Sequence, residues 1–518
     1  MLGNFKRFYK NVRAERTYQQ NINAEKEGVG KPIPSNLDTL KQRLIQMLGE
    51  SSDFVLKKIP LDRNPTVLIA CIEGLADKEL LDRDIIGSVT AYNSRPQSGR
   101  EKFVDYLKNK LVNTCSVKEI SDLDRAVISI LSGEAVVFTD GSRTALSAGI
   151  QKWEKRSPNE PKTGTVLRGP REGFVESIAI NRSMLRRKII NPSLRFETFS
   201  IGRQTKTKVD LCYIKGTASE KIVNEVRKRL LNIKTDVILE SAYLEQFIED
   251  APFSLFATVG NTERPDVAAS KLLEGRVAIL CDGTPFVLTL PYLFVENLQA
   301  GDDYYSRSAT SFFGRMIRFI GFLMTVYLPA LYLSFTCFHQ GAIPFKLLVT
   351  IYTVRVNVPF GIFVSCLFVL LLFALIKEAA ELLPEPVSQT VSIVGGVVVG
   401  QAIITAGLVS VATVIVISIT VITGYVVPEL EKPITIMRVF MLVGANIVGN
   451  LGITLVSIVI FAYMCAIHSI GVPYLSPIAP LSGLDIKDVF FSFPVWAIFQ
   501  KPETITKRYV KRLRGKNG

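Results

Sequence analysis

Long stretches without charge constrain the fold of this chain more than any other feature. Four runs contain no Asp, Glu, Lys or Arg: Phe319–Phe345, Val356–Ile376, Pro386–Pro428 and Val439–Leu484, of 27, 21, 43 and 46 residues. A helix of about 20 apolar residues spans the hydrocarbon core of a bilayer. The runs therefore predict an α-helical, multi-pass membrane domain in the second half of the chain. A large soluble core is the alternative, and runs of this length disfavour it.

The first 300 residues differ in composition and predict a domain outside the membrane. Charged residues recur every few positions up to Arg307, and the whole chain of 518 residues carries a net charge of +14. The N-terminus, MLGNFKRFYKNVRAERTYQQ, lacks the apolar segment of a signal peptide. Residues 501–518 hold seven Lys and Arg residues against one Glu, which favours a cytoplasmic tail. We expect both ends in the cytoplasm, and hence an even number of crossings.

Parity determines how the apolar runs are divided into crossings. Spans are expected at about 319–338, 358–376 and, as one long helix, 439–467. The run 386–428 must then supply one net crossing. We divide it into a Gly-rich re-entrant element or half-helix at 390–408, a break at Gly407, and a span at 410–427. The alternative, a hairpin of two full spans, places the tail outside unless another crossing is added.

The soluble part alternates strand-like and helix-like segments and predicts two α/β subdomains. Strands are expected at 53–59, 66–74, 134–141, 194–200 and 206–214, a hairpin at 275–291, and helices at 119–133, 174–188, 219–232 and 240–249. A Pro- and Gly-rich stretch at 151–172 is expected to link the two subdomains. The predicted divisions are 1–150 and 151–306 for the subdomains, 307–500 for a membrane domain with about four crossings plus re-entrant or interfacial helices, and 501–518 for the basic tail.

No pattern indicates catalysis, a metal or a cofactor. The seven cysteines lie at least 29 residues apart, and the two histidines, His339 and His468, lie near the ends of expected spans. Neither arrangement fits a zinc site or a disulfide framework. The segment EGVGKP (27–32) lacks the spacing of a phosphate-binding loop. We therefore predict a protein that is not an enzyme and needs no cofactor.

Several motifs resemble the A subunits of bacterial nutrient germinant receptors, the GerA family. They are VLRGPREGFVESIAINRSMLRRKI (166–189), SIGRQTKTKVDLCYIKG (200–216), DDYYSR (302–307), KEAAELLP (377–384), SIVGGVVVGQAIITAGLVS (392–410) and GVPYLSPIAP (471–480). The resemblance implies a receptor in the inner membrane of the spore, with a transporter-like B subunit that senses the nutrient and a C lipoprotein. It also implies that several A subunits assemble into a ring that acts as an ion channel.

The glycine- and valine-rich segment is the candidate pore element that this resemblance implies. Gly396 and Gly400 form a pair of small residues that permits close helix approach. When several copies assemble, three valines between these glycines would close a pore by dewetting. Plain helix packing, with the valines toward lipid, is the alternative. The complete set of pore or gate candidates is Gly395, Gly396, Val397, Val398, Val399, Gly400 and Gln401.

Two further groups in the membrane half are candidates for lining a pore. Asn446, Asn450 and Thr454 recur every four residues, so one continuous helix would place them on a single face, either for hydrogen bonds between helices or for contact with water. Glu378 and Glu381 follow the second span and would gather cations at a pore mouth, or simply form a solvated helix end.

Hinges and salt bridges complete the candidate residues. Pro359 and Pro384 flank the second span and are expected hinges. Arg171, Glu172 and Arg264 are expected to form salt bridges between domains or subunits, with solvated charged turns as the alternative.

Three functions remain open at this point. The first is a ligand-gated, oligomeric cation channel, and the second a non-conducting scaffold that couples the nutrient sensor to another channel. The third, a secondary transporter, predicts inverted repeats, and the four apolar segments show none. The expected partners are the B and C subunits and further copies of this chain, with no nucleic acid.

Overall fold

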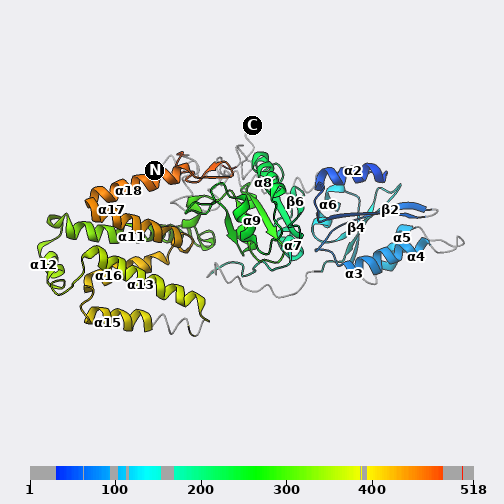
Figure 1. Cartoon of the computed structure of the whole chain (residues 1–518). Helices are drawn as coiled ribbons and strands as arrows, with labels where there is room; N and C mark the ends of the chain where they lie inside the picture. Colours follow the sequence, from blue (N-terminus) through cyan, green and yellow to red (C-terminus); the bar gives the residue numbers. More distant parts are fainter. Residues whose placement is uncertain are drawn as a thin grey trace, which may run out of the picture. The chain divides into compact units, whose positions relative to one another are not determined.

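The computed structural model describes residues 31–61, 64–93, 103–111, 116–152, 168–384, 387, 394–481 and 505 (Figure 1). The chain forms two compact units, one comprising Met1–Glu249, Val259–Pro291 and Trp496–Gly518, the other Asp250–Thr258 and Tyr292–Val495. Three predictions fall largely outside the described residues: the polar N-terminus, most of the linker expected at 151–172, and the basic tail.

The first sheet of the N-terminal unit has helices on both faces. Its strands are β1 (Phe54–Leu61), β2 (Asn64–Ile72), β3 (Ser116–Ile120), β4 (Ala135–Thr139) and β5 (Ala145–Gly149), all antiparallel in the order β1-β2-β4-β5-β3. Side chains alternate along a strand. Leu68, Ala70 and Ile72 of β2 therefore face a core with α2 (Leu37–Leu48) and α6 (Leu123–Leu131). The intervening Val67, Ile69 and Cys71 face η1 (Leu81–Ile86), α4 (Gly87–Asn93) and α5 (Phe103–Leu111).

A second sheet follows in the same unit. Its elements are α7 (Ile178–Lys188), β6 (Leu194–Ile201), β7 (Thr207–Ile214), α8 (Glu220–Asn232), α9 (Ser241–Ile248), β8 (Gly260–Thr262), α10 (Pro265–Leu273), β9 (Val277–Cys281) and β10 (Val287–Leu290). The strands are antiparallel in the order β6-β7-β9-β10-β8. Leu185, Phe196 and Leu272 belong to one core, so α7 and α10 cover the same face.

The structure confirms the predicted strands and helices of this unit, with one correction. The helix expected at 119–133 begins only at Leu123, because Ser116–Ile120 pairs with β5 as strand β3. Asp122 lies between the strand and the helix and caps the helix by accepting a hydrogen bond from the backbone N–H of Asp124. The boundaries 1–150, 151–306, 307–500 and 501–518 stay predictions.

Glu245 on α9 gives the N-terminal unit a pH dependence. Burial, together with the charges of Glu249 and Glu240, raises the pKa of Glu245 to about 7 from its usual 4.5. A carboxyl whose pKa is raised in the folded state stabilises the fold fully below its unfolded pKa. That contribution is lost as the pH rises through about 7. Between pH 4.5 and 8 we expect wild type to lose about 2 kcal/mol of unfolding free energy that Glu245→Gln does not lose. Chemical unfolding at a series of pH values measures this difference. Glu220→Gln, at the exposed start of α8, should leave the pH profile unchanged; equal profiles for wild type and Glu245→Gln would contradict the assignment.

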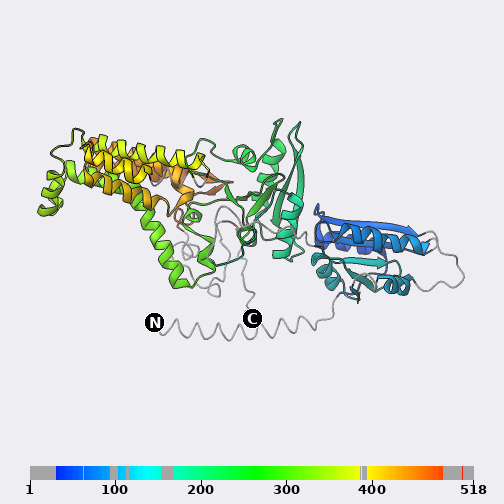
Figure 2. The same ribbon diagram turned by 90° about the horizontal axis from the view of Figure 1, so that it is seen from below.

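The second unit is built mainly of apolar helices (Figure 2). They are α11 (Ser308–Cys337), α12 (Phe345–Thr353), α13 (Ile362–Leu382), α15 (Gly400–Thr405), α16 (Val411–Gly424), α17 (Glu431–Val448) and α18 (Asn450–Ala466). Short 3₁₀ turns and a π-helix complete them: η2 (Phe294–Leu298), η3 (Gly301–Tyr304), η4 (Gln340–Ala342), η5 (Val394–Val399) and η6 (Pro428–Leu430). Among the described residues, α11 and α13 are long and apolar enough to cross a membrane. A third span results if α16 and Pro428–Val448, which meet at 112°, count as one.

Contacts along α11 fix the directions of its neighbours. The Tyr332 hydroxyl lies 3.2 Å from that of Thr413, and Thr325 donates to Thr423 at 2.8 Å, so α16 runs antiparallel to α11. On α17, Arg438 donates to the Thr325 carbonyl, and Gly449 lies against Phe338, so α17 runs parallel to α11. The two helices that follow each other in sequence, α16 and α17, thus run in opposite senses.

The long helix predicted at 439–467 is wrong. Gly449, with a φ of +64°, breaks it into α17 and α18, which fold back on each other as a helical hairpin. The Ser457 hydroxyl contacts the Met441 sulfur at 3.9 Å. Nearer the turn, a Cβ atom added to Gly452 would lie 1.8 Å from the Gly444 carbonyl oxygen. Only a glycine avoids the penalty of a positive φ at the turn, and only glycines allow this approach of two backbones.

The segment after α18 returns to the start of α11. Strands β11 (His468–Ser469) and β12 (Val472–Pro473) form a small hairpin. Tyr474 then packs its ring near those of Phe256 and Phe294. The Phe294 N–H donates to the Tyr474 carbonyl at 3.0 Å. The described part of this unit therefore begins and ends at the same end of its helices.

Candidate functional site

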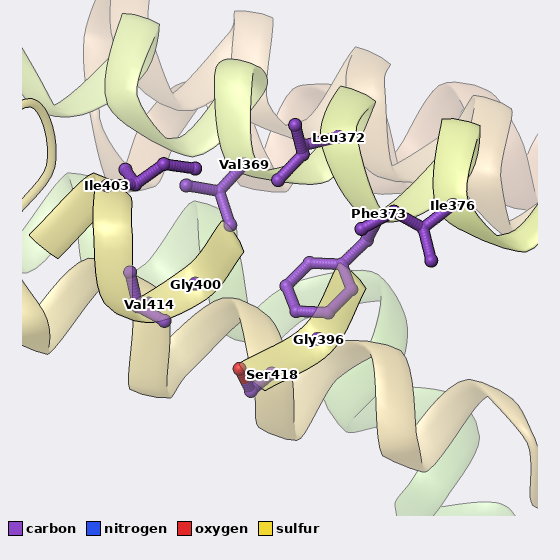
Figure 3. Close-up of a pocket in the computed structure, with 9 residues that line it drawn as sticks. All are labelled: Val369, Leu372, Phe373, Ile376, Gly396, Gly400, Ile403, Val414 and Ser418. Carbon is purple, nitrogen blue, oxygen red and sulfur yellow. The ribbon is translucent and has the colours of Figure 1, made fainter. Parts of the chain in front are cut away.

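The predicted pore element forms two short helical pieces against α13 and α16. The π-helix η5 passes directly into α15, and Gly407, with a φ of +69°, then breaks the helix before α16, as predicted. Figure 3 shows a small cavity between these elements, with Gly396 beside Phe373 and Ser418, and Ile403 beside Val369 and Val414. Since α13 and α16 run in the same direction here, η5 and α15 run opposite to both. A π-helical turn inside a helix often marks a functional position.

Close packing does not explain the two glycines within a single chain. A Cβ atom added to Gly396 or Gly400 would meet nothing within 4 Å. Both residues line the cavity rather than a tight helix contact. Within the described chain no helix approaches closely at these glycines, and their close approach to helices of other copies stays a prediction.

The three valines do not share one environment. Val399 packs against the apolar core of the second unit, so it does not fit the predicted ring. Val398 is 57% exposed and points away from that core. The surroundings of Gly395 and Val397 lie outside what the structure describes. Of the valines whose surroundings the structure describes, Val398 is the exposed one, and its role as a gate stays a prediction.

The exposed face of η5 and α15 carries one large apolar side chain, Val398, beside small and polar ones. Gln401, Ala402 and Thr405 are exposed beside Val398. The Thr405 hydroxyl donates to the Gln401 carbonyl at 2.8 Å, whereas the Gln401 side chain has no hydrogen bond to the described chain. An amide facing lipid without a partner is costly. This face is therefore suited to water or to a neighbouring protein.

Other exposed faces of the same unit are of the opposite kind. On α13, Leu371 and Leu375 are 58% and 60% exposed, and on α18 the exposed side chains include Leu455, Ile458 and Val459. Large apolar side chains of this sort suit contact with lipid. The contrast singles out η5 and α15 as the candidate site of the helical unit.

The predicted polar face of Asn446, Asn450 and Thr454 does not form. The break at Gly449 places Asn446 on α17 and the other two on α18. Asn450 accepts a hydrogen bond from the Ser334 hydroxyl of α11 at 2.7 Å, and the Thr454 hydroxyl donates to the Asn450 carbonyl at 2.9 Å. Asn450 thus serves packing between helices, the simpler of the two readings, and Asn446 and Thr454 are exposed.

The two candidate acidic residues at the end of α13 differ in their partners. Lys377 forms an ion pair with Glu381 at 3.4 Å and another with Glu431 at the start of α17. The same ammonium group lies 5.5 Å from the centre of the Tyr425 ring. Glu378 is exposed and has no ion pair within the described chain. Glu381 thus pairs within α13 with Lys377, which also joins α13 to the start of α17, and the role of Glu378 at a pore mouth stays a prediction.

The predicted hinges lie outside the regular helices. Pro359 lies in the turn that precedes α13, and Pro384 follows its last residue, Leu382. Both positions fit a change of chain direction, and movement about them stays a prediction.

The residues predicted to bridge the soluble subdomains form local pairs instead. Glu172 contacts Arg187 and Lys188 at 3.6 and 3.4 Å, and Arg264 pairs with Asp266 at 2.6 Å. These pairs all lie beside the second sheet, and Arg171 is exposed there. Their role between subunits stays a prediction.

A different, fully buried ion pair joins the two sheets. Arg186 of α7 donates to both carboxylate oxygens of Asp53, at 2.7 and 2.9 Å, and to the Ser51 hydroxyl at 3.1 Å. Both charged side chains are only 1% exposed. Arg186 belongs to the motif RSMLRRKI, but its partner lies 133 residues earlier, and no local pattern indicates the pairing.

Sequence reasoning also missed the role of Asp303 in the motif DDYYSR. Its carboxylate accepts two hydrogen bonds from Arg318, both at 2.7 Å, and one from Arg315 at 3.2 Å. Burial favours a higher pKa for Asp303, but the hydrogen bonds and charge of Arg318 outweigh it and lower that pKa. The cluster anchors η3 to the first turns of α11. The sequence did carry one indication of this cluster: Arg315 and Arg318 are three residues apart, on one face of a helix, just before the charge-free run.

Comparisons with known proteins show the family of this chain. The family model described as "Bacillus/Clostridium GerA spore germination protein" matches residues 42–504. Spore germination protein KA of Bacillus subtilis is 39% identical over 464 residues, which cover 89% of this chain and 85% of that protein. The uncharacterized membrane protein YfkQ of Bacillus subtilis is 35% identical over 92% of this chain and 93% of its own length. The N-terminal domain of the A subunit of the Bacillus megaterium spore germinant receptor GerK3 is 35% identical, with a TM-score of 0.41, over 51% of this chain and 98% of that structure.

The α/β unit followed by apolar helices, with these relatives along most of the chain, defines a protein of the class of germinant-receptor A subunits. The chain belongs to the GerA family of spore germination proteins.

Proposed function

We propose that this chain is a subunit of a nutrient-sensing spore germination receptor whose helical unit conducts cations. The exposed face of η5 and α15 carries this proposal, because it places the Gln401 amide, which has no hydrogen bond to the described chain, where lipid contact would be unfavourable. Copies of the chain arranged around this face would line a water-filled path. A transporter-like B subunit and a C lipoprotein, expected from the family, would sense the nutrient and complete the receptor.

The directions of the helices support an even number of passes. From α11 to α18 the six segments α11, α13, η5 with α15, α16, α17 and α18 alternate in direction. Two antiparallel segments in 386–428, in place of one net crossing, would make the number of passes odd. The second arm of the hairpin of α17 and α18 makes that number even again. With a basic tail on the same side as the soluble unit, positive residues would lie in the cytoplasm. We place the α/β unit and the tail in the cytoplasm on this basis.

Val398 would close the path and Glu378 would attract cations to its end. An apolar constriction excludes water when it is narrow, and widening it admits water and ions. Glu378 lies toward the end of α13 that Lys377 ties to α17, which is the cytoplasmic end in this arrangement. Nutrient binding would act by moving α15 relative to α13, across the cavity that separates them.

Val398→Ala tests this gate in spores. Removing two methyl groups weakens apolar closure by about 1.6 kcal/mol, so we expect ion release on the order of tenfold faster at limiting nutrient, or release without nutrient. Val459→Ala on α18, which is also highly exposed, is the matched control and should behave as wild type. A normal, nutrient-dependent response of Val398→Ala would argue for the alternative, a non-conducting scaffold that couples the sensor to another channel.

A further inference from the structure

Arg438 is a buried arginine without a counter-ion. It lies in the middle of α17 and is only 7% exposed. Its one hydrogen bond runs from Nε to the carbonyl oxygen of Thr325 at 3.0 Å. No carboxylate of the described chain lies within ion-pair distance of its guanidinium.

Other buried arginines of the described chain are compensated. Arg186, Arg264 and Arg315 each pair with an aspartate, and Arg276 lies 3.7 Å from the Glu274 carboxylate. Arg195 has no carboxylate partner but donates to three backbone carbonyls, those of Met47, Pro192 and Leu194. Arg438 therefore stands apart, because within the described chain it has no carboxylate partner and only one backbone acceptor.

A proline in the neighbouring helix explains how Arg438 is positioned. Pro329 lies inside α11 and has no N–H, so the carbonyl of Thr325, four residues earlier, cannot accept its usual helical hydrogen bond. Arg438 satisfies that carbonyl with Nε. The planar guanidinium is thereby held by one edge, and its other edge, with two terminal N–H groups in a fork, remains free for a ligand.

The chemistry of the ligand follows from the charge. A guanidinium keeps its proton, and an uncompensated buried charge is unfavourable by several kcal/mol. The side chains that join the three helices here, Thr325 and Thr423, are neutral and bonded to each other. We infer that Arg438 binds a small monovalent anion, a halide or the oxygens of a carboxylate or phosphate group, between α11 and α17.

The site also bears on the path of cations. A fixed positive charge about two turns into α17 repels cations along the contact between α11 and α17. Cations would then pass on the side of η5 and α15. The anion site itself does not depend on channel activity, because its basis is burial within one chain.

Thermal unfolding of the purified full chain in phosphatidylcholine nanodiscs tests this inference. Sodium chloride and sodium acetate are titrated against sodium isethionate at constant sodium concentration. An anion that binds the native state raises the unfolding midpoint of wild type saturably, by about 2–4 °C at ten times its Kd. Arg438→Gln keeps a donor for the Thr325 carbonyl but lacks the charge, and it should not respond. Arg355→Gln, at a half-buried arginine before α13, should respond as wild type.

Two further arms make every outcome decisive. Arg438→Lys retains the charge without the fork, so its unfolding midpoint should rise with added anion but with weaker affinity. This variant takes the place of Arg438→Gln if Arg438→Gln fails to fold. Nanodiscs with phosphatidylglycerol distinguish the source of the anion: a raised midpoint that no longer responds to chloride assigns the site to the lipid phosphate. No response of wild type in any arm, or the same response in wild type and Arg438→Gln, overturns the inference.

Discussion

Replacing Arg186 by alanine is expected to lower the free energy of unfolding of the N-terminal unit by about 3–5 kcal/mol. The change leaves Asp53 buried with no counter-ion, and the Ser51 hydroxyl loses one of its donors. It also removes the guanidinium that lies 5.1 Å from the centre of the Phe196 ring. Because the pair joins the first sheet to α7, the two sheets should separate in unfolding. Denaturant unfolding followed by a probe in each sheet measures both effects.

A surface pair provides the control. Lys58 and Asp38 lie 3.0 Å apart, but their side chains are 48% and 77% exposed. Lys58→Ala should therefore change stability by about 0–1 kcal/mol. A double variant, Asp53→Ala with Arg186→Ala, should lose much less than the sum of the two single changes, because no unpaired charge is left. Additive losses would show that the pair itself is not the cause.

Replacing Gly452 by alanine is expected to disrupt the hairpin of α17 and α18. The new Cβ atom would lie 1.8 Å from the Gly444 carbonyl oxygen, and backbone cannot move aside as a flexible side chain can. We expect a loss of more than about 4 kcal/mol, or no accumulation of the folded chain in membranes. The measurement is the thermal unfolding midpoint in detergent, together with the amount of protein in the membrane fraction.

Gly341→Ala is the matched control for this change. Gly341 lies in η4, and an added Cβ atom would meet nothing within 4 Å. Its substitution should alter stability by no more than about 0.5 kcal/mol. If Gly452→Ala behaves like Gly341→Ala, the two helices do not approach as closely as the structure shows.

Local patterns in the sequence predict most elements of the fold. The strands from 194 to 214 and the helix from 220 show clear periodicity, and the structure places them within one or two residues of the prediction. The charge-free runs likewise identify α11 and α13. These features depend on neighbouring residues alone, which is why sequence reasoning reaches them.

Contacts between distant segments explain what the sequence did not reveal. Asp53 and Arg186 pair across 133 residues, and either one alone resembles an ordinary surface charge. The hairpin at Gly449 was available in principle, since GANIVGNLG carries three glycines, but an apolar run gives no indication of its own direction. Within the pore element, periodicity alone could not separate the exposed Val398 from Val399, which packs on the core.

The most direct test of cation conduction through η5 and α15 is potassium efflux from vesicles that contain the Val398→Cys variant of the full chain. A thiol reacts with a charged methanethiosulfonate reagent only where water ionises it, not where it faces lipid. We predict that the reagent changes the efflux of this variant and leaves wild type, treated identically, unaffected. If the variant inserts normally but its efflux stays at the level of protein-free vesicles both with and without the reagent, the account is contradicted.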